Sequence, residues 1–211
     1  GGSGCFFSSM QMYDQLSDVS DGGMYCAPTA ASMALSALTF GGVHLYINSW
    51  TWNNFGGKTP EQRIEAFADL MDTTSENGTY YSGIKKFADR AKDFPKATGN
   101  KDAAGSVRLH DSHLRSMIRR GESDVAIYGH YNETCSNVGS SKICTYARDG
   151  GHVIAVNGYY YTPGSSNYTT HIFDPWNGVE IKRDIKKLAN KTTFKMFGIS
   201  FDFRKYGSKT Y

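Results

Sequence analysis

Cys26 is the residue of this sequence best placed to act as a nucleophile. It follows the loop DGGMY and opens an apolar, almost uncharged segment, CAPTAASMALSALT, over residues 26–39. Free N–H groups and the dipole at the start of a helix favour a thiolate, which is the nucleophilic form of cysteine. A cysteine in such a place can also be an inert, small hydrophobic residue. The nucleophile interpretation therefore depends on a base that can reach the sulfur.

His152 offers that base. It follows the pair Gly150-Gly151 and begins the alternating stretch HVIAVNGYYY. The alternation predicts a strand, with the ring projecting at its end and the glycines permitting a close backbone approach. Many histidines at strand starts are merely structural. The order Cys then His, 126 positions apart (152 − 26), is compatible with a catalytic pair.

Asp174 completes a possible triad. It ends the next predicted strand, in the sequence His171-Ile172-Phe173-Asp174-Pro175. A carboxylate there can accept the Nδ1–H of His152, which fixes the tautomer and orientation of the ring. An aspartate that opens a turn before a proline is the structural alternative.

Four short islands of the sequence, taken together, resemble a known group of enzymes. They are Tyr13-Asp14-Gln15, residues 25–33 (YCAPTAASM), residues 151–159 (GHVIAVNGY) and Asp174-Pro175-Trp176. In this order they resemble the bacteriocin-processing, double-glycine-leader peptidases and their secreted relatives, a group of papain-like cysteine peptidases. Papain-like enzymes separate their cysteine and histidine by roughly 130 to 150 residues.

The resemblance implies a role for Gln15. In that family a glutamine upstream of the nucleophile joins the cysteine's own N–H in binding the oxyanion. Gln15 lies 11 residues before Cys26 (26 − 15), so the loop LSDVSDGGM must bulge to return the amide to the site. Two further departures are Ala27, where the family usually has Gly, and the insertion over residues 41–120.

The elements that must position these residues fall into two halves. We expect helices over 26–39, from Thr59-Pro60 to Met71, over 80–92, and from residue 111 or 112 to Gly121. The second half predicts strands over 124–131, 152–161, 170–174, 178–183 and 194–203. This pattern indicates an α+β, papain-like fold, in which the buried helix of Cys26 packs on a mostly antiparallel sheet.

We expect one catalytic domain over residues 13–211, preceded by a flexible segment, 1–12. Its helical subregion would cover 13–120 and its sheet subregion 121–211. The length of 211 residues is sufficient for a single substantial core.

Composition excludes several classes of partner. The net charge is +3, with basic residues scattered along the chain, so no concentrated face for nucleic acid is predicted. No apolar run reaches the roughly 18 to 20 residues that span a membrane, and no signal-peptide core precedes Gly1, which favours a processed form. His110 and His113 are too isolated from further ligands for a metal site. No metal or cofactor is expected.

The remaining cysteines bear on the cellular compartment. Cys135 and Cys144 bracket a short polar loop and favour a disulfide, which would indicate a secreted or periplasmic protein. Two unpaired loop thiols in a cytosolic protein are the alternative. Cys5 has no evident mate and is expected to be free rather than lipidated.

These observations lead to one functional hypothesis and two alternatives. The main hypothesis is a cysteine peptidase that acts on a peptide or protein through Cys26, His152, Asp174 and Gln15 and an acyl-enzyme. The same Cys-His pair would serve a cell-wall peptide amidase. A catalytically silent peptide-binding module could keep the same fold. No oligomeric state is predicted.

Overall fold

The computed structural model describes residues 4–7, 10–36, 53–80, 82–83, 86–87, 123–165, 168–184 and 194–201. Its elements are, in order, β1 (Gly4–Phe7), η1 (Gly22–Met24), α1 (Cys26–Ser36), α3 (Pro60–Leu70), β2 (Ser123–Val138), β3 (Ser141–Tyr161), β4 (Tyr168–Asp174), β5 (Val179–Asp184) and β6 (Phe194–Phe201). The helices precede the main strands of the sheet, which confirms the expected α+β class. No described helix is long and apolar enough to cross a membrane.

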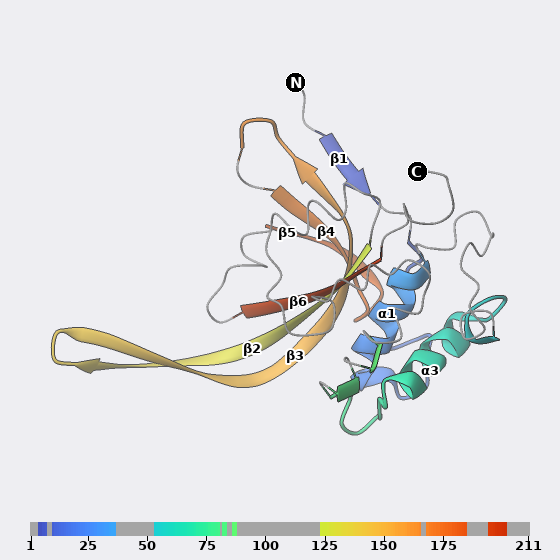
Figure 1. Cartoon of the computed structure of the whole chain (residues 1–211), viewed down its shortest axis with the longest axis horizontal. Coiled ribbons are helices and arrows are strands. Elements are labelled where there is room, and N and C mark those ends of the chain that lie inside the picture. The colour runs from blue at the N-terminus through green and yellow to red at the C-terminus, as the bar shows by residue number, and fades with distance from the viewer. Residues whose placement is uncertain are drawn as a thin grey trace.

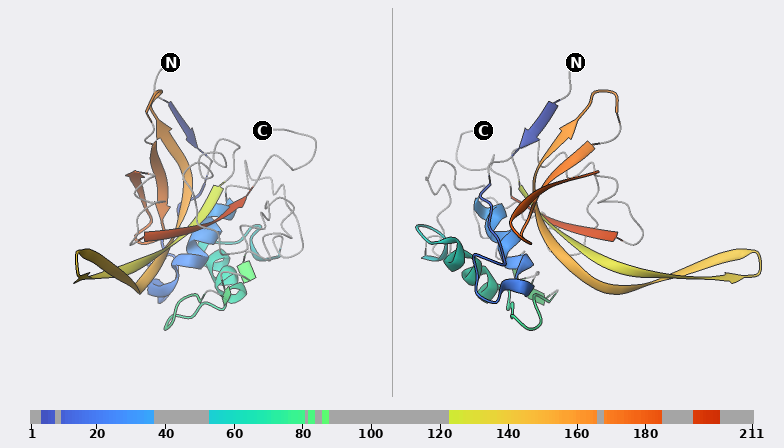
Figure 2. Two further views of the ribbon diagram at one scale, coloured as in Figure 1. Left: turned by 60° about the vertical axis from the view of Figure 1, so that its left-hand side comes forward. Right: turned by 180° about the vertical axis from the view of Figure 1, so that it is seen from behind.

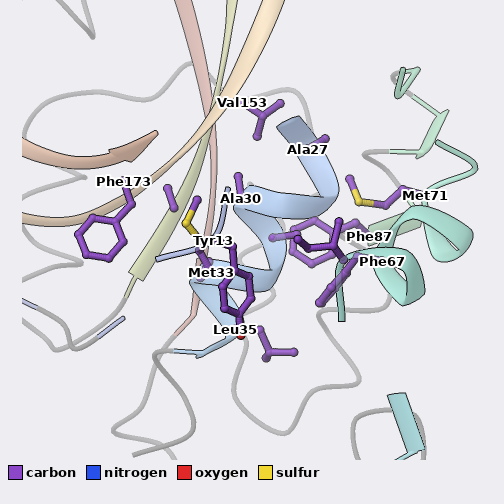
Figure 3. Packing of buried hydrophobic residues seen from close by; sticks show 14 of the residues in the cluster. Tyr13, Ala27, Ala30, Met33, Leu35, Phe67, Met71, Phe87, Val153 and Phe173 are labelled. Atoms are coloured by element: carbon purple, nitrogen blue, oxygen red, sulfur yellow. The ribbon is translucent and has the colours of Figure 1, made fainter. Parts of the chain in front are cut away.

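Helix α1 forms the centre of the core. Every residue from Ala27 to Ser36 is buried, because the helix lies between the sheet on one side and α3 on the other (Figure 1). Its small residues, such as Ala30 and Ala34, are fully buried and let neighbouring elements approach closely. Val153 lies next to α1, as Figure 3 shows, and Phe173 belongs to the same cluster of buried residues. The helix is thus buried nearly all round, as its composition predicted.

Helix α3 begins as the sequence indicated. The side chain of Thr59 accepts from the N–H of Gln62, while the Gln62 side chain accepts from the N–H of Thr59, and Pro60 occupies the first turn. This capping box satisfies two donors that a helix start leaves free. The inner face of the helix buries Ile64 and Phe67 against the core.

The sheet is antiparallel at every described pairing. Its order is β5-β4-β3-β2-β6, and β1 also pairs with β3. The strand β1 was not predicted, because its residues fall in the segment that we expected to be flexible. It pairs with residues 158–161 of β3, so part of that segment is ordered.

The largest difference from the prediction is the length of β2 and β3. We expected a polar loop after residue 131, but both strands continue to a two-residue turn at Gly139 and Ser140, with Gly139 at φ +64°. Glycine suits such a turn because it adopts a positive φ without steric cost. Figure 1 shows the paired strands extending from the body as a long ribbon.

Several predicted features lie outside the described residues. They are the helix from residue 111 or 112 to 121, most of the helix over 80–92, the end of the first helix at 37–39, the last residues of the strand over 194–203, and the histidine pair at 110 and 113.

Candidate active site

Cys26 is the first residue of α1, immediately after η1 and Tyr25. Its side chain is partly exposed, whereas the next ten residues of the helix are buried. The thiol therefore lies at the edge of the core, at the end of the helix where N–H groups are free. It is one of two free cysteines among the described residues; the other is Cys5, which is exposed.

His152 and Asp174 form a hydrogen-bonded pair on neighbouring strands. Nε2 of His152 lies 2.7 Å from Oδ1 of Asp174, and each side chain is 17% exposed. The pair joins β3 to the end of β4. The expected nitrogen was Nδ1, so that detail of the prediction was wrong. Because an ionised carboxylate only accepts, Nε2 carries the proton in this bond.

The other side of the imidazole faces the thiol. His152 makes a side-chain hydrogen bond with Cys26, and since Nε2 is engaged by Asp174, Nδ1 is the nitrogen left for the sulfur. Burial is the largest single influence on His152 and lowers its pKa. The hydrogen bonds to Asp174 and Cys26 and the charges of both groups oppose it, so the pKa rises from 6.5 to about 9. The ring is thereby stabilised as an imidazolium.

Gln15 contacts the residue that follows Asp174, although the two are distant in sequence. Its backbone N–H donates to the carbonyl of Pro175 at 2.9 Å, next to Asp174. Its side-chain nitrogen donates to the carbonyls of Gly22 and Gly23, at 3.0 and 3.2 Å. The intervening loop does bulge, and the amide returns to the segment before Cys26. Gln15 therefore connects the nucleophile loop to the end of β4.

Gly22 makes this return possible. A Cβ at this position would lie 1.7 Å from the main-chain oxygen of Gln15, whereas a Cβ on the exposed Gly23 would meet nothing within 4 Å. Two adjacent glycines thus differ in function: only the first permits the close backbone contact. Gly22 was not predicted as a site residue, and the glycine pair in DGGMY was the only pattern in the sequence that pointed to it.

The turn after β4 holds the acid in place. Oδ1 of Asp174 accepts from the backbone N–H of Trp176 at 2.9 Å as well as from His152. The turn-opening role of Asp174 is therefore real and coexists with its contact to the imidazole. The side chain of Trp176 is 47% exposed. The contact of Trp176 with Asp174 is made by the backbone N–H of Trp176, not by its indole ring.

A second histidine cluster lies on the same sheet. His171 is buried, with Nδ1 2.7 Å from Oδ1 of Asn157 and Nε2 3.1 Å from Oε2 of Glu180. His171 of β4 thus contacts Asn157 of β3 and Glu180 of β5. Neither of these two residues is a cysteine or serine that could act as a nucleophile. No group of three or more His, Cys, Asp or Glu side chains able to hold a metal occurs in the described part of the chain.

Cys135 and Cys144 occupy directly opposed positions near the end of the ribbon. Opposed antiparallel positions bring Cβ atoms within about 4.5–5.5 Å, a separation close to that in disulfides. The side chain of Cys144 lies outside the described part, so the disulfide stays a prediction.

Comparison with known proteins gives one match. The family model described as "Peptidase_C39 like family" matches residues 7–199, a range that contains Gln15, Cys26, His152 and Asp174. No curated protein matches the sequence significantly.

Proposed function

The chain belongs to the peptidase C39-like family, and from this premise we propose that it hydrolyses peptide bonds with Cys26 as the nucleophile. The family is one of peptidases related to papain-like enzymes, so the substrate is a peptide or protein. The α+β fold, with the nucleophile helix packed on an antiparallel sheet, agrees with that relationship.

The observation that carries the proposal is the continuous chain of side chains Cys26, His152 and Asp174. His152 makes a side-chain hydrogen bond with Cys26. It also pairs with Asp174, where its Nε2 lies 2.7 Å from Oδ1. With a pKa of about 9, the His152 ring is an imidazolium at neutral pH, and a neighbouring positive charge is what favours the nucleophilic form of a cysteine. A positioned thiolate–imidazolium pair supplies both the nucleophile and the acid of acyl transfer.

The reaction that follows has two halves. The sulfur of Cys26 attacks the carbonyl carbon of the scissile amide, and the carbonyl electrons move to oxygen. As the C–N bond breaks, Nδ1–H of His152 gives its proton to the leaving amine, and a thioester remains. The neutral ring then takes a proton from water, which attacks the thioester. This step releases the carboxylic acid and restores the thiolate–imidazolium pair.

We assign Gln15 to the oxyanion, together with the backbone N–H of Cys26. The side-chain nitrogen of Gln15 has two hydrogens and already has two carbonyl acceptors, so binding an oxyanion requires it to release one of them. The bond to Gly23 is the longer one, and Gly23 is exposed. Water can therefore solvate the released carbonyl, which favours exchange at Gly23 over the buried Gly22.

We place this activity outside the cytoplasm. The opposed positions of Cys135 and Cys144 support a disulfide, and disulfides persist in oxidising compartments.

Peptide hydrolysis by matched cysteine variants tests the proposal. Cys26→Ser and Cys26→Ala should reduce turnover of a casein-derived peptide mixture to background, whereas Cys5→Ser should retain it, because Cys5 is the other free thiol. Iodoacetamide should modify Cys26 rapidly at mildly acidic pH, where an unactivated thiol reacts slowly. Full activity in Cys26→Ala would overturn the assignment.

A further inference from the structure

The ribbon formed by β2 and β3 extends well beyond the rest of the sheet. We call residues 131–148 the β2–β3 arm. Figures 1 and 2 show it leaving the body on the side away from the helices. All side chains described between residues 134 and 145 are exposed, except that of Cys135, which is partly buried. The described part of the arm therefore contributes little to the core, so burial of apolar side chains does not account for its length.

A bulge separates the arm from the body. Gly129 pairs with Gly151 and Tyr131 with Arg148, so one residue of β2, His130, opposes two residues of β3. Bulges bend and twist a ribbon, and they recur next to active sites. The bulge in β3 lies at residues 149 and 150, and Gly151 and His152 follow directly.

The two edges of β3 are used differently. Along one edge, β2 pairs with residues 141–156 and β1 continues the pairing at 158–161. Along the other edge, β4 pairs only with residues 155–161. Among the described strands, none pairs with this second edge between Ser141 and Ile154. We call this stretch the open edge.

The open edge begins where the catalytic pair lies. The last pair of β3 with β4 is Ala155 with Phe173, and the next residue of β4 is Asp174. His152 lies within the first three residues of the open edge. An extended chain that continued the line of β4 along β3 would therefore start at the His152–Asp174 pair and run outward along the arm.

The open edge carries only some of the features that usually prevent strand addition. Natural edges are blocked by charges, prolines or bulges, and the open edge has one bulge, at residues 149 and 150. No proline occurs between residues 131 and 154, and Lys142 is the single charged residue among the exposed side chains described from 134 to 145. The open edge as a whole contains Lys142, Arg148 and Asp149, and the five residues between Lys142 and Arg148 are uncharged. This stretch offers backbone N–H and C=O groups, which suits recognition of a peptide backbone irrespective of its sequence.

We propose that the open edge binds the peptide substrate as an added antiparallel strand, which leads the chain from the arm into the site of Cys26 and His152. This inference rests on the proposed function and names the form in which the substrate is recognised: an extended segment, held by main-chain hydrogen bonds. Two or more such bonds of average strength should raise kcat/KM for a long substrate about tenfold or more over a short one.

An arm-shortened variant provides the test. Joining His130 directly to Asp149 deletes the arm and leaves a three-residue loop, His-Asp-Gly, between Gly129 and Gly151. Three-residue hairpin loops favour glycine at their last position, so the sheet next to His152 should keep its register. The deletion removes Cys135 and Cys144 together, so neither of these two cysteines is left without the other.

The measurement is kcat/KM for two forms of one casein-derived peptide that the protein cleaves. The short form has about four residues around the cleaved bond, and the long form is extended by about six residues on each side. The wild type should prefer the long form about tenfold or more, and the arm-shortened variant should cleave both alike, with unchanged alkylation of Cys26. N-methylation of alternate residues in the long peptide should remove the preference in the wild type, a result independent of how the variant folds.

Several outcomes would overturn the inference. An equal rate for short and long peptides in the wild type, or an N-methylated peptide cleaved as fast as its parent, excludes strand addition while leaving the peptidase intact. If arm deletion leaves the preference unchanged and instead converts a dimer into a monomer in light scattering, the open edge binds a second copy. Failure of the proposed function is distinct, because then neither peptide is cleaved and Cys26 is not alkylated rapidly.

Discussion

Substitution of Asp174 tests how the pKa of His152 is raised. Oδ1 of Asp174 accepts from Nε2 of His152 and from the N–H of Trp176. Asp174→Asn keeps an acceptor oxygen and removes the charge, whereas Asp174→Ala removes both. A hydrogen bond to a charged group contributes about 1.5–3 kcal/mol, and one pKa unit corresponds to 1.36 kcal/mol. The alanine variant should therefore lower the pKa of His152 from about 9 by about one to two units, and asparagine by less.

The assay is the pH dependence of kcat/KM and of Cys26 alkylation between about pH 5 and 10. Activity should fall at alkaline pH as the imidazolium loses its proton, and this limb should move to lower pH in the order wild type, Asp174→Asn, Asp174→Ala. Thermal unfolding of each variant controls for loss of the turn at Trp176. An alkaline limb that stays in place in a folded Asp174→Ala protein would refute the reasoning.

The same ionisation predicts how stability depends on pH. The folded pKa of His152, about 9, lies above the unfolded value of 6.5. Its contribution to the free energy of unfolding is therefore complete below pH 6.5 and is lost as the pH rises through about 9. The full shift corresponds to about 3 kcal/mol. Urea unfolding should show that the free energy of unfolding falls between pH 6 and pH 9, and that it falls less in Asp174→Ala than in the wild type. An equal fall in the wild type and in Asp174→Ala would contradict the link between the Asp174 contact and the ionisation of His152.

Three further predictions concern the loop and the arm. Gly22→Ala should lower the melting temperature and slow alkylation of the nucleophile, because its Cβ would lie 1.7 Å from the oxygen of Gln15, whereas Gly23→Ala should change neither; equal effects would exclude the close contact as the cause. Gln15→Ala should lower kcat by about 10²- to 10³-fold, the usual effect of losing an oxyanion donor, and an unchanged kcat would remove it from that role. Thiol titration of the denatured protein should give two thiols without reductant and four with it if Cys135 and Cys144 are joined; four in both conditions would exclude the disulfide.

The sequence was sufficient to predict the residues of the candidate site but not all of its geometry. The helix start at Cys26 and the strand ends at His152 and Asp174 carry clear local patterns, and the structure brings these three side chains together. Which imidazole nitrogen faces the acid depends on the orientation of the ring across two strands, and no local pattern encodes this. The path of the loop from Gln15 to Gly22 depends likewise on a single close backbone contact.

The outer part of the β2–β3 arm could not be predicted as strand from its sequence, and the reason is physical. Alternation reveals a strand only when one of its faces is buried. The described side chains near the end of the arm are exposed on both faces, so its polar sequence resembles that of a loop. Where β3 enters the core, at residues 153–159, the predicted strand over 152–161 agrees with the structure.

The pairing of β1 with the far end of β3 affects the order in which the site can form during synthesis. Gly4 pairs with Tyr161, and α1, made early, is buried by strands that are made late. Such distant contacts form slowly because long loops must close first. Cys26 therefore emerges from the ribosome well before His152 and Asp174, and the three side chains cannot come together until residue 174 has been synthesised. The topology itself delays assembly of the candidate site until most of the chain has been made.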